Sequence, residues 1–368
     1  MKETALNVLK KLESNGYEAY IVGGFVRDYI LNRKSVDVDI NTNATPQQIK
    51  HIFPKSFVPK EAYGSITIIE NKVRMEITTF RVEYKYYNNR KPVEIEYTNS
   101  LIDDLKRRDF TINALCMDSN GNIIDPLNVM GDVKNRTIKT IGNSESKFTE
   151  DALRILRAIR FATVLEFKID DEVKESIQKT KKYLSNISYN RKKEELDKIF
   201  MNKNSKYGVD LLLDLGLDKE LEIYNLKDIK LSNDLLGIWS SLQVSENYPF
   251  TKNEKELIKR IKIVEKENNL DNYILYKYGP YVNSVAAVNK GIKHTEVINA
   301  YNSLPIKARS DILISSSEIM SLLNRQPGKY INVIYNDLEL AILNGYLKNT
   351  NESIKQYIIN KYRTTRIG

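Results

Sequence analysis

The chain has 368 residues, more than one hydrophobic core usually organises, so two or more domains are expected. Apolar residues at 41% and charged residues at 29% describe an ordinary soluble protein. The formal net charge of +9 favours a polyanionic partner, although an excess of lysine can also serve as a solubilising surface.

Cysteine and histidine are scarce. The single cysteine, Cys116, excludes an intramolecular disulfide and fits a reducing cytoplasm. With only His51 and His294, the composition argues against a zinc site and against a histidine-aspartate phosphohydrolase. No apolar run is long enough to cross a bilayer, and the N-terminus lacks the apolar core of a signal peptide. We therefore expect a cytoplasmic protein with no membrane partner.

The first third of the chain alternates helical and strand-like patterns. An amphipathic N-terminus precedes an apolar, β-favouring run over residues 19–22, and helical spacing follows over residues 26–31. Further strands are expected over 65–70, 73–80 and 93–97, and further helices over 46–53 and 101–115. The alternation predicts an α/β or α+β unit that ends near residues 136–139.

A pair of glycines precedes a pair of aspartates. Gly23 and Gly24 stand where the first strand meets a helix, a junction at which backbone N–H groups can approach an anion. Asp37 and Asp39 alternate along a strand and so share a face, which is costly unless a cation joins them. Mg²⁺ suits these oxygen ligands together with nucleotide phosphates. The alternative is an ordinary tight turn beside a solvated strand edge.

A third carboxylate comes from the strand expected over residues 73–80. Glu76 could lie across the sheet from the two aspartates and complete the metal site. Equally, it could be an exposed strand residue paired with a lysine or an arginine. The pattern does not choose between these alternatives, because strand neighbours are not known before the fold.

Arg108 and Asp109 belong to the next charged cluster, over residues 106–114. The planar fork of arginine suits phosphate and ribose oxygens, and an adjacent aspartate can accept a hydrogen bond from a sugar hydroxyl. The alternative is a charged helix start with a solvated face. The two residues adjoin the apolar run that begins at Phe110, and this closeness to a core favours a site.

The third cluster covers residues 150–161. Asp151 and Arg154 are three residues apart, so on a helix they can present an acceptor and a donor fork side by side. Arg157 and Arg160 continue the same ridge. Local ion pairs, each contributing a few tenths of a kcal/mol, explain the first pair adequately. They explain three arginines on one ridge less well, because like charges at this spacing repel unless an anion lies against them.

Together these motifs resemble the class II tRNA nucleotidyltransferases, the bacterial CCA-adding enzymes, whose catalytic head is related to DNA polymerase beta. The resemblance covers the first ~200 residues well, with the motifs in the family's order. From residue 148 onward the pattern is almost wholly helical, so the predicted fold class is α+β. The implied domains are a polymerase beta-like head with a mixed sheet over residues 1–139, a helical neck over 140–203, a helical body over 204–275 and a tRNA-binding tail over 276–368.

The resemblance assigns roles to the motif residues. It implies that Asp37 and Asp39 hold Mg²⁺ ions and activate the 3′-hydroxyl of the RNA, with Glu76 as a possible third ligand. Gly24 and Arg27 would contact the nucleotide phosphates. The remaining nucleotide-binding residues would be Arg108 and Asp109 at the ribose, Asp151 and Arg154 at the base of CTP or ATP, and Arg157 and Arg160 nearby.

The implied function is template-independent addition of CCA to the 3′ end of tRNA, from CTP and ATP, with release of pyrophosphate. Residues 81–97 look like the flexible loop that lets relatives switch from CTP to ATP. Asn190 departs from the family, which commonly carries glutamate there. An A-adding enzyme or a poly(A) polymerase is the nearest alternative, although Ala152 stands where those polymerases tend to carry proline. A non-catalytic RNA-binding protein is a remote alternative.

Overall fold

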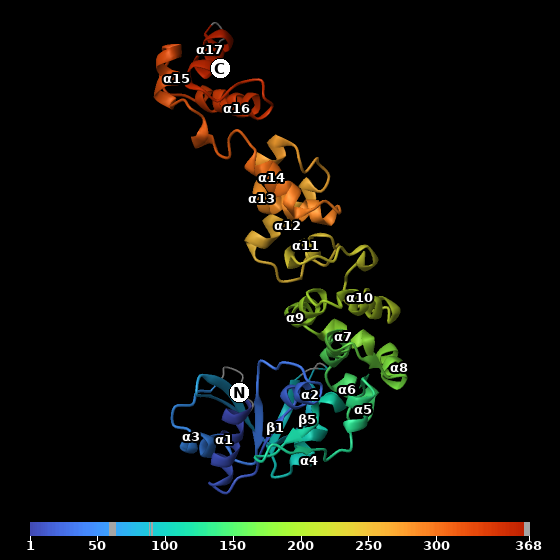
Figure 1. Cartoon of the computed structure of the whole chain (residues 1–368). Coiled ribbons are helices and arrows are strands. Elements are labelled where there is room, and N and C mark those ends of the chain that lie inside the picture. Colours follow the sequence, from blue (N-terminus) through green and yellow to red (C-terminus); the bar gives the residue numbers. More distant parts are fainter. Residues whose placement is uncertain (59–63, 88, 90, 364–368) are drawn as a thin grey trace. The chain divides into compact units, whose positions relative to one another are not determined.

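The computed structural model describes residues 1–58, 64–87, 89 and 91–363 (Figure 1). The chain divides into two compact units. The first unit comprises Met1–Lys227 and Val244–Pro249, and the second unit comprises Asp228–Gln243 and Phe250–Gly368. The finer division into head, neck, body and tail stays a prediction.

A six-stranded mixed sheet organises the start of the first unit (Figure 1). Its order is β3 (Ser65–Glu70), β4 (Val73–Thr79), β2 (Asp39–Thr42), β1 (Ala19–Val22), β7 (Cys116–Met117) and β8 (Ile123–Ile124). Strands β2 and β4 run parallel, whereas the other neighbours are antiparallel. The expected α+β class, with a mixed sheet in the head, is confirmed.

Alternation along the strands separates a core face from a polar face. Ile21, Ile40 and Ile77 lie on neighbouring strands and are fully buried, and the helices α1 (Lys2–Glu13) and α3 (Pro46–Ile52) pack against the sheet. Their neighbours in sequence point the other way, since successive strand residues face opposite sides. Asp39 is therefore carried on the polar face by a strand whose position the core fixes.

Two segments differ from the sequence-based expectation. The expected flexible loop over residues 81–97 is a hairpin of β5 (Arg81–Tyr87) and β6 (Lys91–Tyr97), with Arg90 outside the described residues. The strand expected over 93–97 is present within β6. The helix expected over 101–115 is only α4 (Leu101–Lys106), followed by the short 3₁₀ helix η1 (Thr111–Asn113). The helix does not continue to residue 115, since the backbone is extended at Phe110, whose N–H donates to Asp109 Oδ1.

Helices form the rest of the first unit, as expected. They are α2 (Gly24–Ile30), α5 (Met130–Lys134), α6 (Ser144–Glu150), α7 (Leu153–Leu165), α8 (Asp171–Thr180), η2 (Lys181–Asn186), α9 (Tyr189–Phe200) and α10 (Ser205–Asp214), with the short parallel strands β9 (Thr137–Ile138) and β10 (Lys168–Ile169). Helix α7 is amphipathic: Ile155, Leu156 and Ile159 are fully buried. Its other side is thereby free to face the polar side of the sheet.

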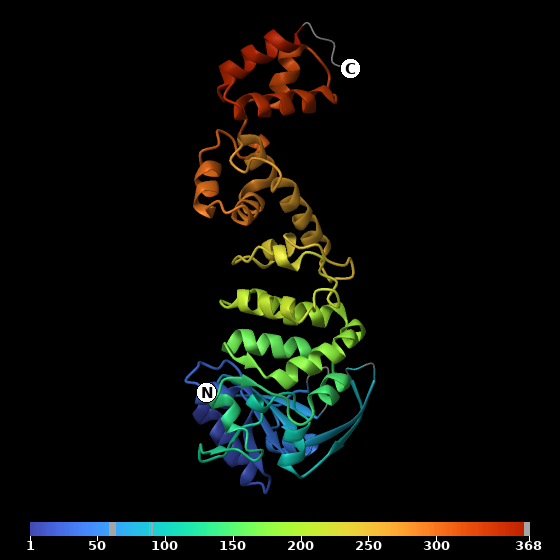
Figure 2. The same cartoon turned by 90° about the vertical axis from the view of Figure 1, so that its right-hand side faces the viewer.

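The described part of the second unit contains helices and connecting segments (Figure 2). The helices that lie wholly within it are α11 (Leu235–Ser240), α12 (Lys252–Val264), α13 (Asn272–Asn289), α14 (His294–Asn302), η4 (Arg309–Asp311), α15 (Ser316–Leu323), α16 (Tyr330–Leu343) and α17 (Asn351–Tyr362), and η3 (Leu226–Asp228) straddles the boundary between the units. Helix α13 is kinked at Gly279, which has a φ of 73° and precedes Pro280. Among the described helices, none combines the length and apolarity that a membrane span requires.

Candidate active site

A pocket of about 960 Å³ opens on the first unit. Its walls come from the turn before α2, the loop before β2, strands β3 and β4, the segment after α4, and helix α7. The residues that the sequence motifs proposed all line this pocket: Gly24, Arg27, Asp37, Asp39, Glu76, Arg108, Asp109, Asp151, Arg154, Arg157 and Arg160. Segments far apart in sequence thus converge on one cavity.

The glycine turn supports a buried arginine. Gly23 has a φ of 72°, and a Cβ on Gly24 would lie 3.5 Å from Arg27 Nη2, so the backbone runs close beneath the guanidinium. Arg27 donates from Nε and Nη2 to Asp28 Oδ1 at 3.0 and 2.8 Å. Its Nη1 donates to Asn113 Oδ1 at 2.7 Å. The guanidinium is therefore fixed before any ligand arrives.

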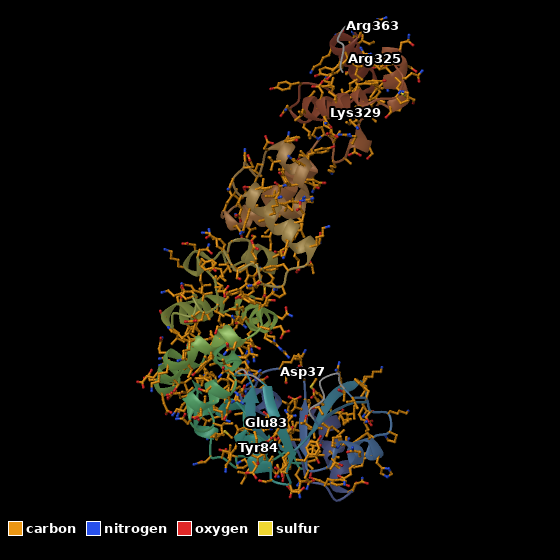
Figure 3. All side chains as sticks on the ribbon, turned by 180° about the vertical axis from the view of Figure 1, so that it is seen from behind. Asp37, Glu83, Tyr84, Arg325, Lys329 and Arg363 are labelled. Carbon is orange, nitrogen blue, oxygen red and sulfur yellow. The ribbon has the colours of Figure 1, made fainter. Side chains whose placement is uncertain are left out.

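The acidic end of the pocket consists of Asp37, Asp39 and Glu76. Asp37 lies in the loop before β2, which begins only at Asp39 (Figure 3). The expectation that both aspartates lie on one strand is therefore wrong for Asp37. Asp39 is opposite Glu76 in the parallel register of β2 and β4. Within the described part of the chain, no donor is hydrogen-bonded to these three carboxylates and no cation forms an ion pair with them.

The surroundings of Asp39 disfavour its negative charge. Its carboxylate is accessible to water, but protein atoms of the pocket surround it on several sides. This desolvation, and then the repulsion from Glu76, raise the pKa of Asp39 above the ordinary 3.8, although Arg108 works in the opposite direction. In the described ranges, no three carboxylate, histidine or cysteine side chains converge as a ready metal cluster. The acidic end thus consists of two carboxylates without bonded partners among the described residues, with a third carboxylate next to them.

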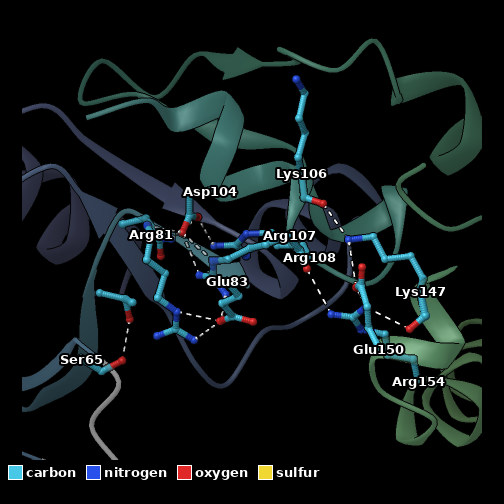
Figure 4. Close-up of polar contacts among 12 residues, drawn as sticks. Ser65, Arg81, Glu83, Asp104, Lys106, Arg107, Arg108, Lys147, Glu150 and Arg154 are labelled. Carbon is cyan, nitrogen blue, oxygen red and sulfur yellow. Dashed lines mark hydrogen bonds and ion pairs between the residues drawn. The ribbon is translucent and has the colours of Figure 1, made fainter. Parts of the chain in front are cut away.

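Arg108 is held by a carboxylate that the motifs did not reveal. Asp104 of α4 is fully buried and accepts from Arg108 Nη2 at 3.4 Å, Arg107 Nε at 2.9 Å and Asn41 Nδ2 at 2.5 Å (Figure 4). Arg108 Nε is buried and, among the described residues, has no hydrogen-bond partner. A Cβ on Gly23 would lie 3.4 Å from Arg108 Nη1. The guanidinium therefore enters the pocket beside the glycine turn with donor capacity to spare.

The hairpin is tied to the same network. Glu83 of β5 accepts from Arg81 Nε at 2.8 Å and from Arg107 Nη1 at 3.2 Å (Figure 4). The hairpin tip also bonds beyond the strand pair: the Ala152 N–H donates to the Asn89 carbonyl at 2.8 Å. The segment expected to be a flexible loop is therefore docked through its base and its tip.

Asp109 is buried in an ion pair with Arg157. Its Oδ2 accepts from Arg157 Nε and Nη2 at 2.8 and 2.5 Å, and its Oδ1 accepts from the Phe110 N–H at 2.8 Å and from Asn113 Nδ2 at 3.3 Å. Burial alone would raise the pKa of this carboxyl, but Arg157 and the other donors outweigh burial and lower it to about 2. Asp109 is therefore ionised at neutral pH and holds Arg157 in place.

Asp151 and Arg154 differ in how far their polar atoms are occupied. Asp151 precedes α7, and its Oδ1 accepts from the Leu153 N–H at 3.0 Å. Within the described residues its Oδ2 has no donor. Arg154 is buried and donates from Nη1 to Glu150 Oε2 at 2.7 Å and from Nη2 to the Arg107 carbonyl at 3.2 Å. The aspartate thus keeps an open acceptor beside a fixed guanidinium.

Each arginine on the α7 ridge has a protein carboxylate as its partner. Arg154 pairs with Glu150, Arg157 with Asp109, and Arg160 Nε donates to Glu195 Oε2 of α9 at 2.5 Å. The anions expected against this ridge are therefore carboxylates of the protein itself. The repulsion along the ridge is relieved by carboxylates from other elements, which spacing within α7 could not reveal.

Three protein families and several solved structures match this chain. The family described as "Poly A polymerase head domain" matches residues 19–139, "Probable RNA and SrmB- binding site of polymerase A" matches residues 166–222, and "tRNA nucleotidyltransferase domain 2 putative" matches residues 225–358. The chain shares its fold with the CCA-adding enzyme of Bacillus stearothermophilus in complex with CTP, at a TM-score of 0.85 and 27% identity over 98% of each chain. It also shares the fold of the Thermotoga maritima enzyme complexed with tRNA, at a TM-score of 0.71 over 96% and 94% of the two chains and 19% identity.

Relatives match along nearly the whole length. A CCA-adding enzyme from a Geobacillus species is 32% identical over 98% of this chain and 97% of its own length. The CCA-adding enzyme of Ligilactobacillus salivarius is 35% identical over 95% and 94%. Because the identity exceeds 30% over almost all of both chains, and because the motifs carry the same resemblance, the chain belongs to the family of class II CCA-adding enzymes.

Proposed function

We propose that this enzyme adds CCA to the 3′ end of tRNA, with CTP and ATP as substrates and pyrophosphate as the leaving group. The observation that carries the proposal is the arrangement of the pocket, in which open carboxylates face a guanidinium with unused donors. Arg108 lies beside Asp39 at the Gly23 turn, and its Nη1 donates no hydrogen bond within the described part of the protein. A nucleotide with bound divalent cations would satisfy both groups.

The acidic end fits Mg²⁺. Mg²⁺ binds through one or two carboxylates together with water and substrate phosphates, and Asp37 and Asp39 offer that number of open oxygen ligands. When bound, the ions would lower the pKa of the RNA 3′-hydroxyl and neutralise charge on the pyrophosphate. Glu76, opposite Asp39, is the candidate for a further ligand.

The triphosphate would lie between the glycine turn and two arginines. Gly24 lets the backbone approach closely, and Arg27 and Arg108 are guanidinium groups already oriented by neighbouring side chains. Such fixed donors stabilise developing charge without reorganising during the reaction. Arg108 and Asp109 are assigned to the ribose, and two of the four hydrogen bonds that Asp109 accepts come from Arg157, which Asp109 therefore also supports.

Base selection would rest on Asp151 and Arg154. The open Oδ2 of Asp151 can accept from the exocyclic amino group that cytosine and adenine share, and Arg154 supplies donors next to it. Uracil and guanine present a carbonyl at the corresponding position and would meet this carboxylate unfavourably. A buried polar site of this kind discriminates because a wrong base leaves its groups unpaired.

The second unit offers basic side chains for the tRNA backbone. Lys329 and Arg363 are exposed there, and Arg325 is half-buried in the same unit (Figure 3). Lysine and arginine neutralise phosphates, so tRNA affinity should decrease as salt concentration rises.

The reaction itself provides the first test. The protein is incubated with tRNA transcripts that end at the discriminator base, at C or at CC, with CTP and ATP supplied separately and together. Full activity predicts CMP addition to the first two transcripts and AMP addition to the third. AMP addition alone would indicate an A-adding enzyme, long adenosine tails would indicate a poly(A) polymerase, and no incorporation would contradict catalysis.

The choice of base provides the second test. Asp151→Ala removes the open acceptor, so the preference for CTP over UTP should fall at least about tenfold, while the reaction rate with CTP falls less. The measurement is kcat/KM for each triphosphate on the transcript that ends at the discriminator base. Unchanged discrimination in this variant would exclude Asp151 from base selection.

A further inference from the structure

Three arginines of the pocket surround the ring of Phe161. The guanidinium carbons of Arg27 and Arg157 each lie 5.4 Å from the ring centroid, and that of Arg160 lies 4.1 Å from it. Arg27 comes from α2, whereas the other two come from α7. The ring also lines the pocket, and 7% of the residue is exposed. One aromatic side chain thus links the two elements that carry these cations.

The place of Phe161 on α7 is unusual for a core residue. It lies four residues after Arg157 and seven after Arg154, so it continues the arginine ridge. Its ring packs edge-to-face against Phe110, with centroids 5.8 Å apart and an interplanar angle of 78°. An apolar ring in the wall of a charged pocket is explained if its π-electrons serve the cations around it.

The ring adds a contact that the carboxylate partners of the three arginines do not provide. Arg27, Arg157 and Arg160 pair with Asp28, Asp109 and Glu195 respectively, which neutralises their charge. These ion pairs anchor the three cations separately, whereas the ring of Phe161 lies near all three of them. A guanidinium confined between a carboxylate and the electron-rich face of a ring has less freedom than one in an ion pair alone.

We propose that Phe161 is a positioning residue for the nucleotide, whose ring holds Arg27, Arg157 and Arg160 at the spacing that the bound triphosphate and ribose require. The inference rests on the proposed function, because it takes an NTP as the ligand. The ring itself need not touch the nucleotide. It orders the arginines in advance, so that less freedom is lost when the nucleotide binds.

Substitutions that separate the ring's π-electrons from its bulk test this role. Phe161→Leu keeps an apolar side chain but removes the aromatic face, whereas Phe161→Tyr keeps the face. We expect Phe161→Leu to raise the KM for both CTP and ATP about 3- to 30-fold, with a smaller change in kcat, and Phe161→Tyr to restore most of the affinity. The affinity for CTP of the protein without tRNA, measured by calorimetry, should decrease in the Phe161→Leu variant as the KM rises.

Phe167→Leu is the matched control. Phe167 is buried just after α7 and lies outside the pocket lining, so the same change should lower the thermal unfolding temperature and leave the KM near that of the wild type. Equal KM values for Phe161→Leu and wild type, or equally raised KM values for Phe161→Leu and Phe161→Tyr, would overturn the proposal. Failure of the proposed function looks different, because the wild-type protein would then incorporate no nucleotide.

Discussion

The two ends of the pocket handle charge in opposite ways. At the acidic end, Asp37, Asp39 and Glu76 face solvent within the cavity and, in the described residues, no hydrogen-bond donor or cation is bonded to them. At the arginine end, buried Asp109 has four hydrogen bonds and a full ion pair with Arg157. The first end retains unbalanced charge, and the second is balanced by the protein itself.

The carboxylates of the acidic end need a bound cation to balance their charge, whereas the arginines are already ion-paired before a ligand binds. Repulsion between neighbouring unpaired carboxylates destabilises the ligand-free protein, and a bound cation relieves this repulsion. Paired arginines are stable in the empty protein and present only their remaining donors to a ligand. The acidic end should therefore dominate catalysis, whereas the arginine end should contribute to both binding and folding stability.

The largest expected effect comes from the acidic end. Asp39→Ala removes one of the two proposed Mg²⁺ ligands on the pocket side of β2, so CMP incorporation into tRNA should fall by at least about 1,000-fold. The folded structure should persist, because no described side chain depends on this carboxylate for a hydrogen bond. Single-turnover incorporation of labelled CMP measures the loss.

The control for this variant is Asp171→Ala. Asp171 begins α8, its side chain is 90% exposed, and it lies outside the pocket lining. The same chemical change there should leave incorporation within about twofold of wild type, as expected of an exposed ion pair. If Asp39→Ala retained comparable activity, the assignment of the acidic end to catalysis would be wrong.

The contrast also shows which parts of the site could be predicted from the sequence. Local motifs identified Asp39, Arg108 and Arg157 because a glycine turn, strand alternation and helical spacing are short-range signals. The partners Asp104 and Glu195 were missed, because they come from α4 and α9 and only the tertiary fold brings them to the arginines. Spacing along one helix cannot show whether a neighbouring element supplies a counter-charge.

The sequence also predicted part of the fold. The strands over 65–70 and 73–80 were recognised from alternation, and the helical remainder from composition. The helix expected over 101–115 was too long, because apolar spacing continued past Lys106 although the backbone turns extended at Phe110. The strand expected over 93–97 is present within β6, but its pairing with β5 in a hairpin is set by the cross-strand register, which periodicity alone does not reveal.

An intermediate effect is expected at the arginine end. Asp109→Asn leaves the half-buried Arg157 without its counter-charge, so the free energy of unfolding should decrease by about 2 kcal/mol, less than for a fully buried pair. Urea denaturation at pH 7 measures this loss. The KM for CTP should also rise, because Arg157 is no longer held. A fall in activity with unchanged stability would instead indicate that Asp109 acts only on the ligand.

The pH dependence of this pair has a definite sign. The pKa of Asp109 is lowered to about 2, so its contribution to stability is present above the ordinary 3.8 and is lost as the pH falls towards 2. The Asp109→Asn variant should therefore be less stable than wild type at pH 7, and the two should converge in acid. Parallel stability curves at all pH values would exclude the ion pair as the cause.

The smallest expected effect is a gain in stability, opposite in sign to that of Asp109→Asn. It comes from the aspartate-to-asparagine change at Asp39 in the acidic end. The pKa of Asp39 is raised, so the folded state binds the proton more tightly than the unfolded chain, and stability falls as the pH rises from 3.8 through that raised value. Asp39→Asn removes this cost and should stabilise the metal-free protein at pH 7, by less than about 1 kcal/mol since water screens the exposed carboxylate. Thermal unfolding in EDTA between pH 4 and pH 7 tests it. The gain should vanish towards pH 4, and addition of Mg²⁺ should stabilise the wild type but not the variant, because only the wild type retains both proposed ligands.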